Sequence, residues 1–177
     1  MRFKPQLQTM VKVYIYAALR REEALWLTAE DVRLRDGANG MIRVRAKTID
    51  GTSWQPKGNR AVPISRAIRS RLDRYTPRAS DAAWYFPSPN GTHWDADNSS
   101  ADLRAANAEA GLRWTCLDYR HTFGSQLAQN NVSLYKLTTL VGKSPEICHR
   151  HYVALVSEAM ASEVGFAAVQ IENRLHG

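Results

Sequence analysis

Residues 31–47 read DVRLRDGANGMIRVRAK, and this stretch predicts a β-hairpin. Apolar and charged residues alternate on both sides of the turn-rich segment 36–40, as they do in strands with one buried face. A third short strand is expected over residues 60–64, where Pro63 favours an edge position because proline cannot donate to a neighbouring strand. These segments together predict a small three-stranded antiparallel sheet.

Helices are predicted both before and after these strands in the sequence. Residues 4–20 carry apolar side chains at i, i+3 and i+4 spacing, and Thr28 with Asp31 is a capping signal. After the sheet, Ser65 is a candidate N-cap, and a long connection rich in proline covers residues 76–96. Further helices are predicted over 97–110, 118–129, 133–141, from 144 onward and over about 156–169. The sequence therefore predicts one α+β domain over residues 1–177, mostly α-helical, with its small sheet near the N-terminus.

Composition narrows the class of protein. The 177 residues are 44% hydrophobic and 23% charged, which is typical of a water-soluble globular domain. No apolar run is long enough to span a membrane, and the first residues are not a secretory signal. Cys116 and Cys148 form neither a disulfide framework nor a metal-ligand spacing. We therefore expect a reduced cytoplasmic protein, with no metal and with two packed thiols.

The charge balance points to a polyanionic partner without establishing one. The net charge is +7, and arginine supplies 18 of the 24 basic residues. Arginine suits phosphate recognition because its planar guanidinium can hold two oxygens at once.

Individual polar residues have ordinary explanations when each is taken alone. Arg20 could be a solvated residue or pair with Glu23, and Lys57 lies in a loop where surface lysines are common. Arg120 begins a helix, and Tyr152 could be amphipathic packing at a helix end. Only their order and spacing carry information.

Four segments in order resemble the conserved boxes of the tyrosine recombinases, the phage integrase family. The first is AALRREEALWL at 17–27 with EDV at 30–32. It is followed by PKGNRAVPI at 56–64, which is similar to the family's β-hairpin lysine and the strand after it. LDYRHTF at 117–123 and LVGKSP at 140–145 resemble the third and fourth boxes, and Tyr152 stands at the family's nucleophile position. The resemblance covers most of the chain.

The resemblance implies a set of catalytic residues that act on double-stranded DNA without a cofactor. They are Arg20, Lys57, Arg120, Lys143 and Tyr152, with Glu23 and His121 in supporting positions. Tyr152 would form a covalent 3′-phosphotyrosine, the arginines would stabilise charge on the phosphate, and Lys57 would protonate the leaving 5′-oxygen. Lys143 stands where the family usually has His or Trp, and it can still donate a hydrogen bond.

Leu117 departs from the family pattern, which has histidine at this position. Leucine can neither donate to a phosphate nor move a proton. One interpretation is an active enzyme that lacks one catalytic residue of the family and depends on Lys57, Lys143 or the nearby His149 and His151. The other is a DNA-binding domain with impaired cleavage, and loss of one general acid or base costs about 10² to 10⁴ in rate.

The resemblance also raises expectations about the whole protein. Family members carry an N-terminal core-binding domain that we do not find here, so we expect an isolated catalytic domain that is monomeric when free. On recombining DNA we expect a tetramer, in which residues 155–177 either pack on a neighbouring protomer or complete their own core. Site-specific recombination of a mobile element is the leading function. Relaxation of DNA in the manner of a type IB topoisomerase is an alternative. The sequence does not identify the DNA target.

Overall fold

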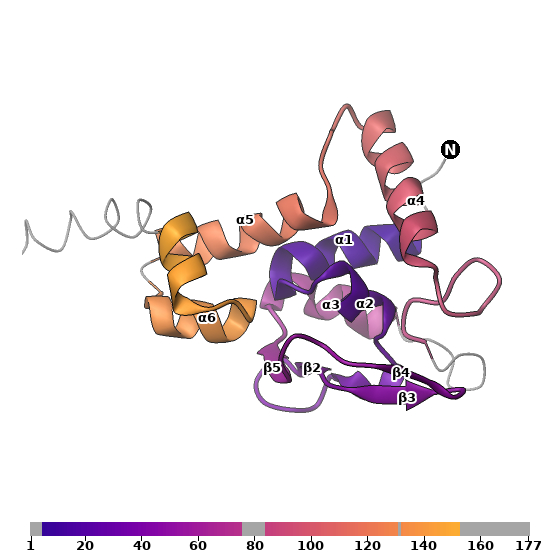
Figure 1. The fold of residues 1–177 in the computed structure, drawn as a ribbon, viewed down its shortest axis with the longest axis horizontal. Coiled ribbons are helices and arrows are strands. Elements are labelled where there is room, and N and C mark those ends of the chain that lie inside the picture. Colours follow the sequence, from indigo (N-terminus) through magenta and orange to yellow (C-terminus); the bar gives the residue numbers. More distant parts are fainter. Residues whose placement is uncertain (1–4, 76–83, 131, 153–177) are drawn as a thin grey trace, which may run out of the picture. The chain divides into compact units, whose positions relative to one another are not determined.

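The computed structural model describes residues 5–75, 84–130 and 132–152. The chain divides into two compact units, Met1–Phe123 and Gly124–Gly177, and helix α5 runs across the boundary (Figure 1). The first unit contains α1 (Pro5–Ala17), α2 (Arg21–Leu25), η1 (Ala29–Asp31), β1 (Val32–Arg33), β2 (Met41–Val44), β3 (Lys47–Ile49), β4 (Thr52–Trp54), β5 (Arg60–Pro63), α3 (Arg66–Arg74) and α4 (Ala96–Glu109). Then follow α5 (Cys116–Gln129) and α6 (Leu134–Val141).

The predicted three-stranded antiparallel sheet is confirmed. The strand order is β1-β2-β5, with Val32 opposite Ile42 and Ile42 opposite Val62. Strand β5 lies at an edge, as Pro63 predicted. The strands are shorter than expected, since β1 contains only two residues and β2 ends at Val44.

A second sheet, the β3–β4 hairpin, was not predicted. Lys47 pairs with Trp54 and Ile49 with Thr52 across a tight turn at Asp50 and Gly51. Both turn residues have positive φ, +50° and +75°, as a two-residue turn between right-twisted strands requires. The segment between the predicted hairpin at 31–47 and the predicted strand at 60–64 is therefore partly strand.

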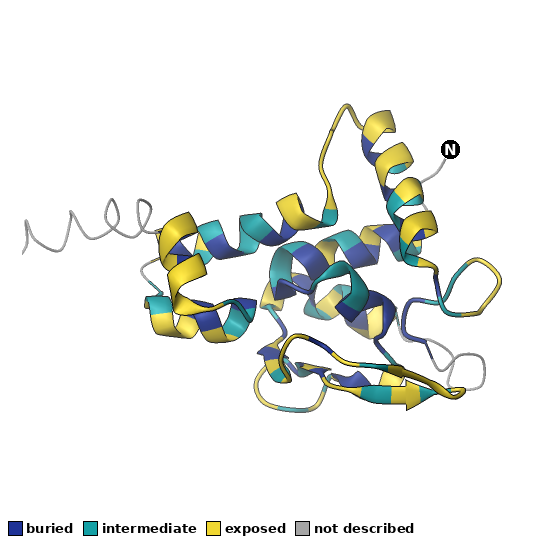
Figure 2. Cartoon of the chain, viewed as in Figure 1, coloured by how far each residue is buried: buried dark blue, intermediate teal, exposed yellow. Residues whose placement is uncertain are grey.

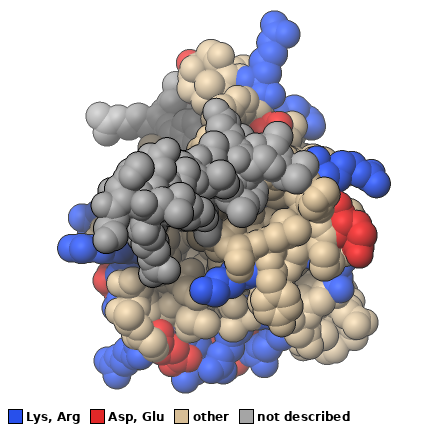
Figure 3. Space-filling model, turned by 90° about the vertical axis from the view of Figure 1, so that its left-hand side faces the viewer, with Lys and Arg blue, Asp and Glu red and all other residues tan. Residues whose placement is uncertain are grey.

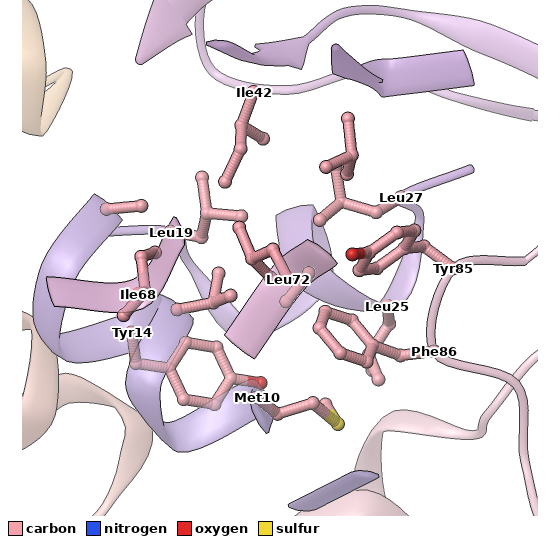
Figure 4. Close-up of a cluster of buried hydrophobic side chains, with 14 of the residues drawn as sticks. Met10, Tyr14, Leu19, Leu25, Leu27, Ile42, Ile68, Leu72, Tyr85 and Phe86 are labelled. Atoms are coloured by element: carbon pink, nitrogen blue, oxygen red, sulfur yellow. The ribbon is translucent and has the colours of Figure 1, made fainter. Parts of the chain in front are cut away.

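The core of the first unit lies between α1, α3 and the inner face of the sheet. Figure 4 shows Met10 and Tyr14 from α1 near Ile68 and Leu72 from α3, with Ile42 above them. The stripe of buried residues along α1 in Figure 2 is the face whose spacing predicted this helix. Complete burial of a large apolar side chain stabilises a fold by about 1.5–3 kcal/mol, so this cluster holds the sheet to the helices.

The helix ends follow the predicted capping signals. The Ser65 hydroxyl accepts from the Ala67 N–H at the start of α3, and Asp95 caps α4 through the N–H groups of Asp97 and Asn98. Thr28 and Asp31 form the expected capping box around η1.

The second unit is helical over its described residues. After α5, helix α6 begins at the N-cap Ser133 and ends at Gly142, whose φ of +62° is left-handed. Residues 145–152 form a further helix, as the Ser144-Pro145-Glu146 signal predicted. The predicted stretch 156–169 and the segment 155–177 lie outside the described residues. No described helix is both long and apolar enough to cross a bilayer.

Candidate active site

The turn between α1 and α2 positions Arg20. Ala18 lies in the short link between α1 and α2 and has φ +51°, which is unusual for a residue with a side chain. Arg20 then occupies the N-cap of α2 in an extended conformation. Its backbone N–H donates to Glu23 Oε2 at 2.7 Å, and its Nη1 donates to Glu23 Oε1 at 2.7 Å. The Arg20 side chain remains 25% exposed, so its guanidinium can reach a ligand.

Glu23 is a buried carboxylate that joins three arginines. Besides Arg20, it accepts from Arg60 Nη1 and Nη2, each at 2.7 Å, and its Oε2 lies 3.8 Å from Arg120 Nη1. The Glu23 side chain is 1% exposed. Burial by itself would raise the pKa of Glu23, but the hydrogen bonds and charge of Arg60, with the hydrogen bonds of Arg20, lower it to about 2. Glu23 is therefore ionised at neutral pH.

Arg120 reaches the same cluster from α5. Its side chain is 3% exposed, and its Nη1 donates to the Ala18 carbonyl at 2.9 Å. The unusual turn at Ala18 thus supplies an acceptor for Arg120 in addition to placing Arg20. Arg20, Glu23 and Arg120 are brought together here although 100 residues separate the first from the last.

A pocket of about 390 Å³ opens beside Arg20, and its lining includes Lys57. Arg21, Glu22, Trp54 and Gln55 contribute to the same walls. The Trp54 ring is stacked on Trp26, with centroids 5.6 Å apart and planes 7° from parallel, which fixes one wall. Two cations from different elements, one on an α2 cap and one on the loop after β4, thus face one cavity. Guanidinium and ammonium groups are the side chains that bind phosphate in proteins.

A second lysine, Lys47, lies inside the β3–β4 hairpin itself. Its ammonium group donates to the Trp26 carbonyl at 2.7 Å and also pairs with the buried carboxylate of Asp31. Burial alone would raise the pKa of Asp31, but hydrogen bonds from Lys47, Arg45 and Thr28 lower it. Lys57, by contrast, is an exposed residue of the loop between β4 and β5.

Two further positions of the third box lie on α5. Leu117, where the family pattern has histidine, is in the first turn and is 54% exposed. His121 is half-buried one residue after Arg120. The exposure of Leu117 indicates that packing does not require an apolar residue there.

Lys143 and Tyr152 belong to the second unit. Lys143 directly follows the left-handed Gly142, and its N–H donates to the Thr138 carbonyl at 3.3 Å. Tyr152 and Cys148 are both buried on one face of the helix 145–152, whereas His149 and His151 are exposed. His149 therefore points away from the face shared by Cys148 and Tyr152.

Tyr152 packs closely against helix α5 at Gly124. A Cβ atom on Gly124 would overlap the phenol at Cζ and the hydroxyl oxygen, and would lie 2.8 Å from Cε1. Real Cβ atoms do not make such contacts, so only glycine allows this position of the ring.

The sequence analysis did not single out Arg60 as a site residue. A signal was present, because Arg60 shares strand parity with the apolar Val62 and Ile64, so its side chain points to the buried face. An arginine on an inward face needs a buried acid as partner, and Glu23 is the one observed.

The chain matches the model of the phage integrase family over residues 3–158. The chain belongs to the phage integrase family. No curated protein matches. Among solved structures, XerA recombinase superposes with TM-score 0.70 at 19% identity, over 90% of this chain and 57% of the other. The Tn1549 transposon integrase in complex with transposon right end DNA superposes with TM-score 0.75 at 17% identity, over 92% of this chain and 59% of the other. XerH site-specific recombinase bound to difH substrate superposes with TM-score 0.63 at 20% identity, over 84% of this chain and 42% of the other.

These likenesses confirm the fold as that of a tyrosine recombinase catalytic domain. The chain spans less than two thirds of the length of these three proteins.

Proposed function

We propose that this chain cleaves and rejoins DNA strands at specific sites through a covalent 3′-phosphotyrosine at Tyr152. The observation that carries the proposal is the Glu23 cluster, in which one buried carboxylate holds both Arg20 and Arg120 beside a pocket lined by Lys57. Membership of the phage integrase family supports the same chemistry.

The arginines would act on the phosphate. Attack by an oxygen nucleophile places additional negative charge on the non-bridging oxygens, and cations fixed beforehand stabilise that charge more than they stabilise the ground state. Loss of one such preorganised donor typically costs about 2.7–4 kcal/mol in activation free energy.

The covalent step exchanges one phosphoester for another. The Tyr152 hydroxyl oxygen would bond to phosphorus as its proton passes to solvent water, and the bond from phosphorus to the 5′-oxygen would break. The 5′-oxygen would take a proton from Lys57 and depart as a hydroxyl group. Rejoining is the reverse reaction, and it needs no ATP because the phosphotyrosine retains the ester bond.

A nicked duplex that loses its 5′-hydroxyl fragment on cleavage tests this function. The unaltered chain should accumulate a covalent complex on such DNA, and Tyr152→Phe should bind the DNA without forming the complex. Accumulation of the complex by Tyr152→Phe would remove Tyr152 as the nucleophile.

A DNA-binding domain with reduced cleavage is the second candidate, and Leu117 is the observation that favours it. An exposed leucine occupies a position from which the family's histidine would act. Binding of the nicked duplex without any covalent complex would establish this alternative.

The structure also raises a second candidate for the general acid. The sequence resemblance assigned the hairpin lysine to Lys57, yet the lysine that lies in the hairpin strands is Lys47. Lys57 remains our assignment because it lines the pocket with Arg20, whereas Lys47 is paired with Asp31.

A substrate with sulfur in place of the bridging 5′-oxygen separates the two lysines. A thiolate leaves without needing a proton, so this DNA bypasses the general acid. Lys57→Ala should be slow on ordinary DNA and recover on the sulfur substrate, whereas Lys47→Ala should show no selective recovery. Recovery by Lys47→Ala alone would transfer the role to Lys47.

Double-stranded DNA is the proposed partner, and basic side chains are spread over the face shown in Figure 3. Structural relatives include integrases and recombinases in complex with DNA. We propose a monomer in free solution and a tetramer on recombining DNA, which light scattering with and without DNA would distinguish.

A further inference from the structure

Arg60 is a buried arginine that no box of the sequence resemblance assigned to catalysis. Its side chain is 6% exposed, compared with 25% for Arg20, and it is absent from the pocket lining. It holds Glu23 with two parallel hydrogen bonds, Nη1 to Oε1 and Nη2 to Oε2, and its Nη2 also lies 3.5 Å from the Ala18 carbonyl. Arg60 therefore contacts the two acceptors that orient Arg20 and Arg120.

The charge balance of the cluster explains what a third arginine contributes. One carboxylate between Arg20 and Arg120 alone would cancel much of the charge that a phosphate needs. With Arg60 as its bidentate partner, Glu23 can still hold the other two guanidinium groups in place while the cluster keeps two excess positive charges. The carboxylate then orients both groups without neutralising them.

The position of Arg60 in the sheet makes its contact with Glu23 rigid. Arg60 is the first residue of β5 and pairs with Val44 of β2, while Val62 of the same strand is fully buried. Long side chains lose little further entropy on binding where packing has already fixed them. The sheet therefore fixes Arg60, and Arg60 in turn fixes the Glu23 carboxylate.

We propose that Arg60 is a positioning residue for strand cleavage, which fixes the Glu23 carboxylate so that Arg20 and Arg120 meet the phosphate with their charge intact. This inference rests on the proposed function. It predicts an effect on the rate of the chemical step rather than on DNA affinity, because the Arg60 side chain does not reach the surface.

The test compares Arg60→Met with Arg43→Met on the nicked duplex at saturating DNA. Arg43 is the matched control because it lies on the adjacent strand β2, is 51% exposed and pairs with the partly exposed Asp36. Arg60→Met should slow covalent complex formation on the order of 10²-fold with little change in the dissociation constant for DNA. Arg60→Lys should stay slow, because an ammonium group cannot make the two parallel hydrogen bonds.

Two further measurements separate positioning from folding. The double variant Glu23→Gln with Arg60→Met leaves only Arg120 buried opposite the amide, so it should melt above the Glu23→Gln single variant and still cleave slowly. In Arg60→Met the acid limb of the pH–rate profile should move to higher pH, because Glu23 keeps Arg20 and Arg120 but loses its strongest cationic partner.

The outcomes distinguish this inference from the proposed function. A normal cleavage rate for the double variant, or for Arg60→Met itself, would overturn the role of Arg60 alone. Failure of the unaltered chain to form any covalent complex would overturn the proposed function and this inference together.

Discussion

Glu23 is the residue on which the geometry of the site depends. Its carboxylate caps α2, anchors Arg20, pairs with Arg60 and approaches Arg120. A buried carboxylate that loses its charge leaves its cationic partners in a low-dielectric interior without compensation. The effect on stability and the effect on catalysis should therefore appear in the same variant.

Glu23→Gln should lower the free energy of unfolding at neutral pH by about 3–5 kcal/mol, since it leaves Arg60 and Arg120 buried opposite a neutral amide. Urea denaturation measures this loss. Glu22→Gln is the control, because Glu22 is 42% exposed and pairs with Arg21 at the surface. The control should change stability by less than about 1 kcal/mol. Equal losses for the two variants would contradict a special role of Glu23.

The same carboxylate predicts a pH dependence of stability. The pKa of Glu23 is lowered to about 2 in the folded chain from an ordinary value of 4.5. Its contribution is thus present above pH 4.5 and is lost as the pH falls toward 2. The stability difference between the unaltered chain and Glu23→Gln should shrink over that window. A difference that stays constant would show that Glu23 is not perturbed.

Leu117 allows a gain-of-function test by a single substitution. Leu117→His restores a group that can donate to phosphate or move a proton, at an exposed position where the fold tolerates a polar side chain. If the leucine limits cleavage, the rate of covalent complex formation should rise by about 10²-fold or more. An unchanged rate with intact Tyr152 would mean that the chain does not need the histidine.

At the scale of elements, the sequence predicted what local signals determine. Neighbours in the chain determine the Ser65 N-cap, the capping box of Thr28 with Asp31 and the turn before β2, and the structure confirms all three. The β3–β4 hairpin was missed because both strands are short and mostly exposed, without an alternating buried face. The Asp50-Gly51 turn was its available signal.

The candidate site divides in the same way. Arg20, Glu23 and Arg120 stand out through the order of the boxes, and the structure places them in one cluster. Arg60 could not be recognised by order alone, because its contact with Glu23, 37 residues earlier in the chain, depends on the pairing of β5 with β2. Side-chain parity on a strand was the only local indication.

Helix α5 offers a test of how Tyr152 is held. Gly124→Ala should displace the phenol and lower the melting temperature by roughly 3–8 °C, because overpacking in a filled site costs about 1–3 kcal/mol. In a Tyr152→Ala background the same change should stabilise, since alanine is the better helix former. Gln126→Ala, at an exposed position of α5, is the control. A loss that persists without the ring would contradict the contact.

At the scale of the whole molecule, the net charge of +7 predicts DNA binding through phosphates. Each phosphate neutralised releases counterions, so the affinity should fall steeply between roughly 50 and 200 mM salt. A fluorescently labelled duplex titrated across this range measures the slope. An affinity that is insensitive to salt would contradict a phosphate-dominated interface.

The central claim is that Tyr152 carries the DNA. Digestion of the covalent complex followed by mass spectrometry identifies the modified residue directly. The account predicts that the 3′-phosphate is attached to the peptide that contains Tyr152. Attachment to another tyrosine, of which Tyr135 at 80% exposure is the most accessible in the described part of the second unit, would contradict it.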